Sequence, residues 1–152
     1  MTPRTTPFPN LWTVERRRCR VYVASKSELG PMWQMFRDDW AKTLPQVEVV
    51  ASWIDMSGPD EGLDWPTFIR EAGTCDVLLA VHRPGDVWKG AFVEIGAALA
   101  SNATVIVMGD PPGSWKQHPN VTQVVDLAYD PGFALVDYLA GGPTSWRHEP
   151  KP

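Results

Sequence analysis

Hydrophobic positions along the chain alternate between two patterns. Short, nearly continuous apolar runs, typical of strands buried on both faces, are separated by stretches in which apolar residues recur every three or four positions. The runs predict strands at residues 19–24, 47–53, 76–81, 103–108 and 122–127. The stretches between them predict helices at residues 30–43, 65–73, 90–101 and 131–140.

Strands that alternate with helices are typical of an α/β fold. We therefore expect a five-stranded parallel sheet with helices on both faces, a Rossmann-like or flavodoxin-like three-layer sandwich joined by right-handed crossovers. The 152 residues suffice for one domain. Residues 19–140 would form it, and the proline-rich segments 1–18 and 141–152 would be extended tails.

Composition and charge exclude several classes of protein. The net charge of −4 argues against a basic face that binds a nucleic acid polymer, and no apolar run approaches the roughly 20 residues of a membrane span. Cys19 and Cys75 are too far apart in a two-cysteine chain to suggest a disulfide framework. The three histidines show no metal-ligand spacing. We therefore expect a cytoplasmic protein without a metal, a redox cofactor or a membrane partner.

Ligands of open α/β sheets bind beyond the carboxyl ends of the strands. This rule selects the loops at residues 25–30, 54–64, 82–89 and 109–119. The first of them lacks the glycine pattern of dinucleotide-binding folds, and the chain contains no P-loop motif. The sequence therefore gives no support for the usual dinucleotide or triphosphate sites.

The segment from residue 75 to residue 109 carries the strongest chemical signal. The helix expected to begin near Gly90 places Glu94 in its first turn or just after it, near the mouth of the third strand and toward the same cleft as Asp86. A carboxylate there is also stabilised by the helix dipole, by about 0.3–1 kcal/mol. Periodicity alone leaves both a catalytic and a merely stabilising Glu94 open.

The sequence V-H-R-P-G-D at residues 81–86, followed by G-A-F-V-E-I-G-A-A-L-A at residues 90–100, resembles the nucleoside 2-deoxyribosyltransferase family. That superfamily includes N-glycosidases that hydrolyse 2′-deoxynucleoside 5′-monophosphates and hydroxymethyl-CMP. Its hallmark, a Glu followed by an aliphatic residue, Gly, any residue and Ala, matches the chain from Glu94 to Ala98. The resemblance spans residues 20–126 and implies that Glu94 is the nucleophile that attacks the anomeric carbon.

Other positions match the family less evenly. The resemblance implies that Tyr22 lines the base or sugar pocket, and that Asp86 helps to bind the base or sugar, with Trp88 partly filling that place. We take Asp86 as the candidate proton donor to the leaving base. Where the family has an Asp on the second predicted helix this chain has Phe68, and Asp64 is the nearby substitute.

Two further loops supply candidate substrate contacts. The hydroxyls and the cation of the run Ser25, Lys26 and Ser27 suit a phosphate, although Ser27 as a helix cap beside a solvated Lys26 explains them equally well. In the family, a neighbouring subunit completes the pocket through the loop after the fourth strand, which implies a homodimer; a simple turn is the alternative. Gly90 and three residues of that loop complete the expected substrate contacts: Ser114, His118 and Asn120.

The leading hypothesis is an N-glycosidase that cleaves the base–sugar bond of a (deoxy)nucleoside 5′-monophosphate through a covalent glycosyl-enzyme intermediate. The partner would be a small nucleoside or nucleotide, and no cofactor is needed. Three alternatives remain: a nucleoside 2-deoxyribosyltransferase, a TIR-like domain that cleaves NAD or senses a nucleotide, and a non-catalytic nucleotide binder.

Overall fold

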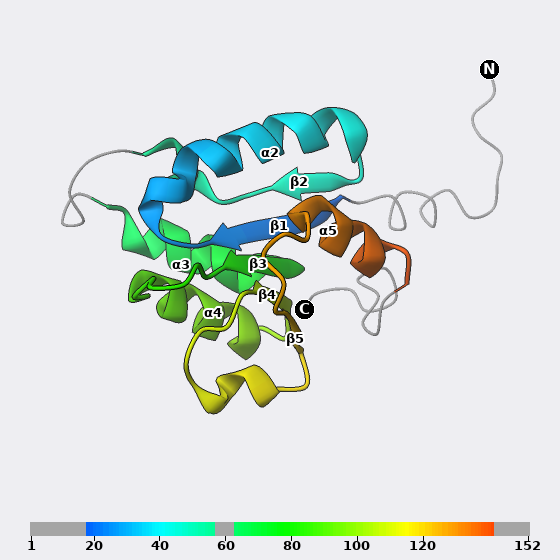
Figure 1. The fold of residues 1–152 in the computed structure, drawn as a ribbon. Helices are drawn as coiled ribbons and strands as arrows, with labels where there is room; N and C mark the ends of the chain where they lie inside the picture. The colour runs from blue at the N-terminus through cyan, green and yellow to red at the C-terminus, as the bar shows by residue number, and fades with distance from the viewer. Residues whose placement is uncertain (1–17, 57–62, 142–152) are drawn as a thin grey trace, which may run out of the picture.

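The computed structural model describes residues 18–56 and 63–141, and its centre is a parallel sheet in the order β2-β1-β3-β4-β5 (Figure 1). The strands are β1 (Cys19–Ala24), β2 (Val47–Val49), β3 (Val77–Val81), β4 (Thr104–Met108) and β5 (Val121–Val124). The helices are α2 (Gly30–Thr43), α3 (Trp65–Thr74), α4 (Gly90–Ala100) and α5 (Pro131–Leu139). The predicted α/β fold is confirmed. The tails expected before residue 18 and after residue 141 lie outside the described residues.

The helices cover the sheet in two layers, with α2 and α5 on one face and α3 and α4 on the other (Figure 1). Side chains of β1, β3 and β4 form the core between the layers and are almost entirely buried. On the first face, the start of α5 approaches α2 closely, because a Cβ at Gly132 would lie 3.1 Å from Nε1 of Trp40. Both layers therefore pack tightly on the sheet, which fixes the positions of the loops at its ends.

Two strands end earlier than the sequence predicts. The strand expected at residues 47–53 ends at Val49, and residues Ser52–Asp55 form a short 3-10 turn, η2. In this turn, side-chain hydrogen bonds take the place of the backbone hydrogen bonds between strands. Trp53 Nε1 donates to the Val23 carbonyl at 2.7 Å, and the Ser52 hydroxyl donates to Glu71 at 2.9 Å. The last strand ends at Val124 rather than at residue 127, because Asp126 accepts from the Ala128 amide at 2.9 Å and starts a turn.

The starts of three helices differ in a way that bears on function. Asp64 caps α3 by accepting from the Thr67 amide at 3.2 Å, and Asp130 caps α5 by accepting from the Gly132 amide at 2.6 Å. Helix α4 follows Lys89 and has no side-chain cap. Its first amide groups and the positive end of its dipole therefore face the end of the sheet without a carboxylate to neutralise them.

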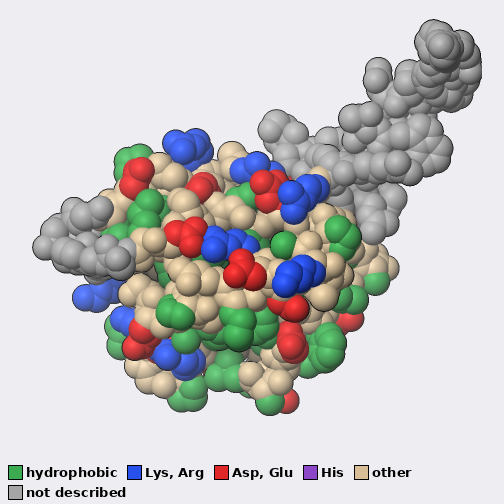
Figure 2. All heavy atoms as spheres, turned by 90° about the horizontal axis from the view of Figure 1, so that it is seen from above, with side chains coloured by type: hydrophobic (Ala, Val, Ile, Leu, Met, Phe, Trp, Pro, Cys, Tyr) green, Lys and Arg blue, Asp and Glu red, His purple; other side chains and the backbone are tan. Residues whose placement is uncertain are grey.

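The face over α2 carries both signs of charge in alternation (Figure 2). Arg37 of α2 pairs with Asp55 at 2.7 Å and lies 3.8 Å from Asp38. A surface of interspersed charges does not attract a polyanion over a wide area. None of the helices in the described part of the chain is both long and apolar enough to cross a membrane.

Gly109, directly after β4, provides a test of the fold. It has φ of +105°, and a Cβ there would lie 2.0 Å from the His82 carbonyl oxygen. We expect Gly109→Ala to lower the free energy of unfolding by about 2–4 kcal/mol. The added methyl group would push the backbone of His82 away, and alanine would also be strained at this positive φ. Urea denaturation measures this change.

The matched control is Gly96→Ala on the exposed side of α4, where nothing lies within 4 Å of the added Cβ. We expect it to stabilise the protein by about 0.5–1 kcal/mol through helix propensity. Equal effects of the two substitutions would contradict the close approach described for Gly109.

Candidate active site

A pocket of about 130 Å³ lies at the carboxyl ends of β1 and β3. The helices that follow these two adjacent strands, α2 after β1 and α4 after β3, lie on opposite faces of the sheet. This point is therefore the switch point where doubly wound folds bind ligands. Three of the four loops selected from the sequence contribute to it, and the loop after β4 does not. The lining residues are Ser25, Lys26, Ser27, Trp53, Leu63, Trp65, Phe68, Val87, Trp88, Lys89, Gly90, Ala91 and Glu94.

Glu94 is the chemical centre of this pocket. It lies just after the first turn of α4 and is only 5% exposed. Tyr22, fully buried on β1, donates its hydroxyl hydrogen to Glu94 Oε2. The hydrogen bond joins residues 72 positions apart and orients the carboxylate, so the sequence prediction that brings Tyr22 and Glu94 to one site agrees with the geometry.

Burial controls the protonation of this pair. Removal from water raises the pKa of Glu94 to about 7, while the Tyr22 hydrogen bond opposes this rise and the charge of Glu71 adds to it. Burial, followed by the charge of Glu94, also raises the pKa of Tyr22 well above its usual range. Near neutral pH, Tyr22 therefore keeps its proton, and Glu94 is poised between its neutral and charged forms.

One end of the pocket is suited to an anion. Lys26 and Lys89 both line it, together with the hydroxyl-bearing Ser25 and Ser27. The uncapped start of α4 lies at the same place, because Gly90 also lines the pocket. The Ser25 hydroxyl already donates to the Lys26 carbonyl at 3.0 Å and accepts from Trp33 Nε1 at 2.9 Å. Two ammonium groups, the Ser27 hydroxyl and a helix N-terminus remain, and together they are typical of a phosphate site.

Four aromatic residues of the pocket lining, called the aromatic wall below, are Trp53, Trp65, Phe68 and Trp88. Trp65 and Phe68 meet edge to face, with ring centroids 5.7 Å apart. The Trp65 ring lies so close to the start of α4 that a Cβ at Gly90 would come within 2.3 Å of it. Gly90 thus lets the wall approach the helix, and the wall offers flat apolar surface to a planar ring.

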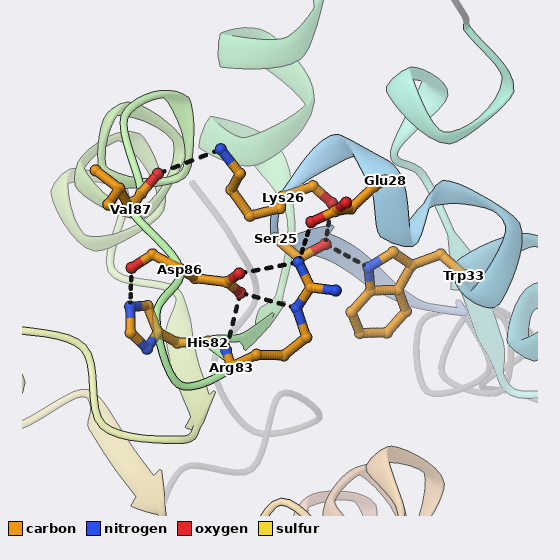
Figure 3. A network of polar contacts seen from close by, with 8 residues as sticks. All are labelled: Ser25, Lys26, Glu28, Trp33, His82, Arg83, Asp86 and Val87. Carbon is orange, nitrogen blue, oxygen red and sulfur yellow. Dashed lines mark hydrogen bonds and ion pairs between the residues drawn. The ribbon is translucent and has the colours of Figure 1, made fainter.

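A network of polar contacts ties the loop after β3 to the loop after β1 (Figure 3). Arg83 donates to Asp86 through its backbone amide at 2.9 Å and through Nε at 3.1 Å, and its guanidinium also pairs with Glu28 of the turn η1 (Ser27–Leu29). On the pocket side, Lys26 Nζ reaches the Val87 carbonyl at 3.5 Å. The loops that carry Lys26 and Lys89 are therefore held together.

The same network argues against the role that we predicted for Asp86. Burial by itself would raise the pKa of Asp86, but the hydrogen bonds from Arg83 outweigh this effect and lower it. Asp86 is not among the residues that line the pocket. A general acid needs a raised pKa and access to the substrate. The carboxylate of Asp86 instead accepts hydrogen bonds from Arg83 within its own loop.

Five other predicted site residues also lie outside this pocket. Tyr22, expected to line it, is fully buried and reaches the site only through its hydrogen bond to Glu94. Asp64 is exposed and caps α3, so it does not substitute for the acid missing at Phe68. Ser114 and His118 are exposed on the turn after β4, and Asn120 donates to Asn102 Oδ1 at 2.9 Å. Whether a second subunit brings the last three to the pocket remains a prediction.

Sequence reasoning missed two charged residues of the site, Lys89 and Glu71. Lys89 immediately precedes α4, and the lack of a capping residue at that position is the signal that could have found it. Glu71 lies one turn after Phe68 on α3, so the helical repeat could have found it on the same face. Among the described residues, no three His, Cys, Asp or Glu side chains lie together as a metal site would require.

Fold and pocket together define a doubly wound α/β protein with a buried carboxylate in a pocket at the carboxyl ends of its strands. Comparison with protein-family models gives no match, and neither does comparison with curated proteins. Among solved structures, the chain is similar to the CMP N-glycosidase BcmB of Clostridium botulinum, with a TM-score of 0.51 and 18% sequence identity. The alignment covers 78% of this chain and 96% of that one, which establishes a shared fold.

The raised pKa of Glu94 predicts how stability depends on pH. The folded protein holds the proton of Glu94 more tightly than the unfolded chain does. The free energy of unfolding therefore falls as the pH rises from about 4.5 through about 7. We expect Glu94→Gln to stabilise the protein by about 3 kcal/mol at pH 8, and to change little at pH 4. Thermal and urea unfolding across this range measure the difference; a difference that is the same at every pH would contradict the burial of a titrating Glu94.

Proposed function

We propose that this protein is a nucleotide N-glycosidase, which cleaves the base–sugar bond of a (deoxy)nucleoside 5′-monophosphate with Glu94 as the nucleophile. The observation that carries the proposal is the buried Tyr22–Glu94 pair in a pocket that also presents two lysines. The protein of similar fold described above is a CMP N-glycosidase, and this likeness supports the same substrate class.

The proposed reaction has two displacement steps. The Glu94 carboxylate attacks C1′ of the sugar while the bond to the base breaks, and the base leaves with the bonding electrons and takes up a proton. A glycosyl-enzyme ester results, and water then attacks C1′ and releases the sugar phosphate and Glu94. The tyrosine hydroxyl orients the carboxylate through its hydrogen bond to Oε2.

The two sides of the pocket assign the ends of the substrate. The 5′-phosphate would lie between Lys26 and Lys89 at the start of α4, where charge and amide groups favour an anion. The base would pack against the aromatic wall of Trp53, Trp65, Phe68 and Trp88. With the substrate bound in this way, the anomeric carbon would lie near Glu94.

A homodimer belongs to the proposal as well. The resemblance to the deoxyribosyltransferase family implies that a neighbouring subunit contributes Ser114, His118 or Asn120 to the pocket. The exposure of Ser114 and His118 leaves them available for such a contact.

Base release is the direct test of the proposed activity. We expect a free base to appear, by chromatography, when the protein meets a panel of nucleoside 5′-monophosphates, and we expect Glu94→Gln to reduce the rate roughly 10³-fold or more. Because Glu94 must be ionised to attack, the wild-type rate should rise with pH through about 7.

The other arms of the panel separate the alternatives. Release that requires a second base would indicate a deoxyribosyltransferase, and release of nicotinamide from NAD would indicate a TIR-like activity. Equal binding of nucleotides by wild type and Glu94→Gln, with no turnover of any substrate, would refute the enzyme and favour a nucleotide binder.

The phosphate end of the pocket gives a separate prediction. We expect Lys26→Ala and Lys89→Ala each to lower kcat/KM for the 5′-monophosphate roughly 10-fold or more, the usual effect of losing a charge-assisted hydrogen bond. The same changes should leave cleavage of the corresponding nucleoside nearly unaffected. Steady-state kinetics on both substrates measure the ratio.

Lys42→Ala is the matched control, because Lys42 is an exposed lysine in the last turn of α2, away from the pocket. An equal loss on nucleotide and nucleoside in the Lys26 and Lys89 variants, or an equal loss in Lys42→Ala, would argue against a phosphate site at this end.

A further inference from the structure

Trp88 has a fixed place in the pocket, just before the start of α4. It lines the pocket and is 5% exposed. The ring of His82 meets the Trp88 ring edge to face with centroids 4.9 Å apart, and the ring of Phe92 does so at 5.4 Å. The backbone before Trp88 is held as well, because His82 Nε2 donates to the Asp86 carbonyl at 2.9 Å. The pocket therefore has an indole ring whose position is set by its neighbours.

Trp88 differs from three other tryptophans in the hydrogen bonding of its indole N–H. The N–H groups of Trp33, Trp53 and Trp115 donate to a hydroxyl or a carbonyl oxygen, at 2.9, 2.7 and 2.9 Å. The N–H of Trp88 is buried and has no acceptor among the residues that the structure describes. Native proteins keep few buried donors without an acceptor, because each one lowers stability. In a pocket, a bound ligand can supply the acceptor.

The base that leaves in the proposed reaction needs a hydrogen-bond donor beside it. Glu94 is the one acidic residue among the described residues that line the pocket, and it is the proposed nucleophile. Asp86, the acid predicted for this task, accepts hydrogen bonds from Arg83 instead. The two lysines of the pocket are assigned to the phosphate. The N–H of Trp88 is thus a buried donor that the base could use.

We propose that Trp88 is a further catalytic residue, whose indole N–H donates a hydrogen bond to an acceptor atom of the leaving base, a ring nitrogen or a carbonyl oxygen. The inference rests on the N-glycosidase activity proposed above. As the bond between base and sugar breaks, its electron pair stays with the base, and the negative charge that develops on the acceptor atom strengthens the hydrogen bond. The indole keeps its proton throughout, and the base takes up its proton from water.

The hydrogen bond itself is observable by NMR without turnover, in the Glu94→Gln variant. The indole N–H signal of Trp88 is assigned as the one that disappears when Trp88→Phe is added. This N–H is enclosed and unbonded in the free protein, so a bond to the base requires a small turn of the ring. We expect its proton signal to move downfield when cytidine or adenosine 5′-monophosphate, or the 2′-deoxy form of either, is added.

Two controls belong to this measurement. Ribose 5-phosphate carries the phosphate and the sugar but no base, so it should leave the Trp88 signal unmoved. The indole signal of Trp40 should stay in place with every ligand, because Trp40 is buried where α2 meets the start of α5, outside the pocket.

Kinetics separates a catalytic N–H from a ring that only packs. Trp88→Phe keeps an aromatic ring and loses the N–H, and we expect kcat to fall roughly 10-fold or more with KM nearly unchanged. The loss should be smaller for a nucleotide whose base leaves more easily, such as a 5-fluoropyrimidine. Trp115→Phe is the matched control: it removes an indole N–H that already has an acceptor and lies outside the pocket, so kcat should keep the wild-type value.

The rival explanation is that the N–H of Trp88 points at the ring face of His82 or Phe92 and is satisfied there. In that case no nucleotide moves the signal, and Trp88→Phe lowers stability without a change in kcat. Either result, or an equal fall of kcat in Trp115→Phe, overturns the inference. Should Trp88→Phe not fold, the Trp88 signal is assigned from its contacts with the His82 and Phe92 rings.

The two readouts keep this inference apart from the proposed function. Base release with an unmoved Trp88 signal refutes the inference alone. A moved signal in a protein that releases no base refutes the proposed activity, and the catalytic role of Trp88 with it, and leaves a ligand contact. A moved signal together with a lower kcat in Trp88→Phe supports both.

Discussion

The structure depends on one costly interaction, a carboxyl group withdrawn from water beside a buried tyrosine. A charge in such a place destabilises the fold unless it is neutralised or hydrogen-bonded, and the hydroxyl of Tyr22 supplies a hydrogen bond to the carboxylate of Glu94. The sheet order brings the two together, because β1 lies beside β3 and α4 crosses back over both. The rest of the pocket is arranged around this pair.

The parts of the molecule that follow local rules could be predicted from the sequence. Continuous apolar runs located the buried strands β3 and β4 to within one residue, and Pro66 marked the first turn of α3. Glu94 was found because its neighbours form a short motif on one helix. The end of β2 could not be predicted, since Trp53 leaves the strand to bond with Val23, a contact 30 residues away in the chain.

The acids of the site show the same limit. Asp86 has the position of a substrate ligand in the sequence, yet an arginine three residues earlier occupies its carboxylate in the structure. Glu71 belongs to no sequence motif. Its charge raises the pKa of Glu94, and its carboxylate accepts a hydrogen bond from Ser52, 19 positions away in the chain. Residue type and spacing identify candidates, but the partner of each carboxylate decides its chemistry.

The ion pairs of Arg83 have one more consequence for a site of this kind. The pair with Glu28 joins the loops after β1 and β3, and the contact of Lys26 with the Val87 carbonyl adds a second link between them (Figure 3). Under the proposed function, loops joined in this way set the distance from the bound anionic group to the reacting carbon. Selectivity for one phosphate would then follow from the length of the ligand, whatever base it carries.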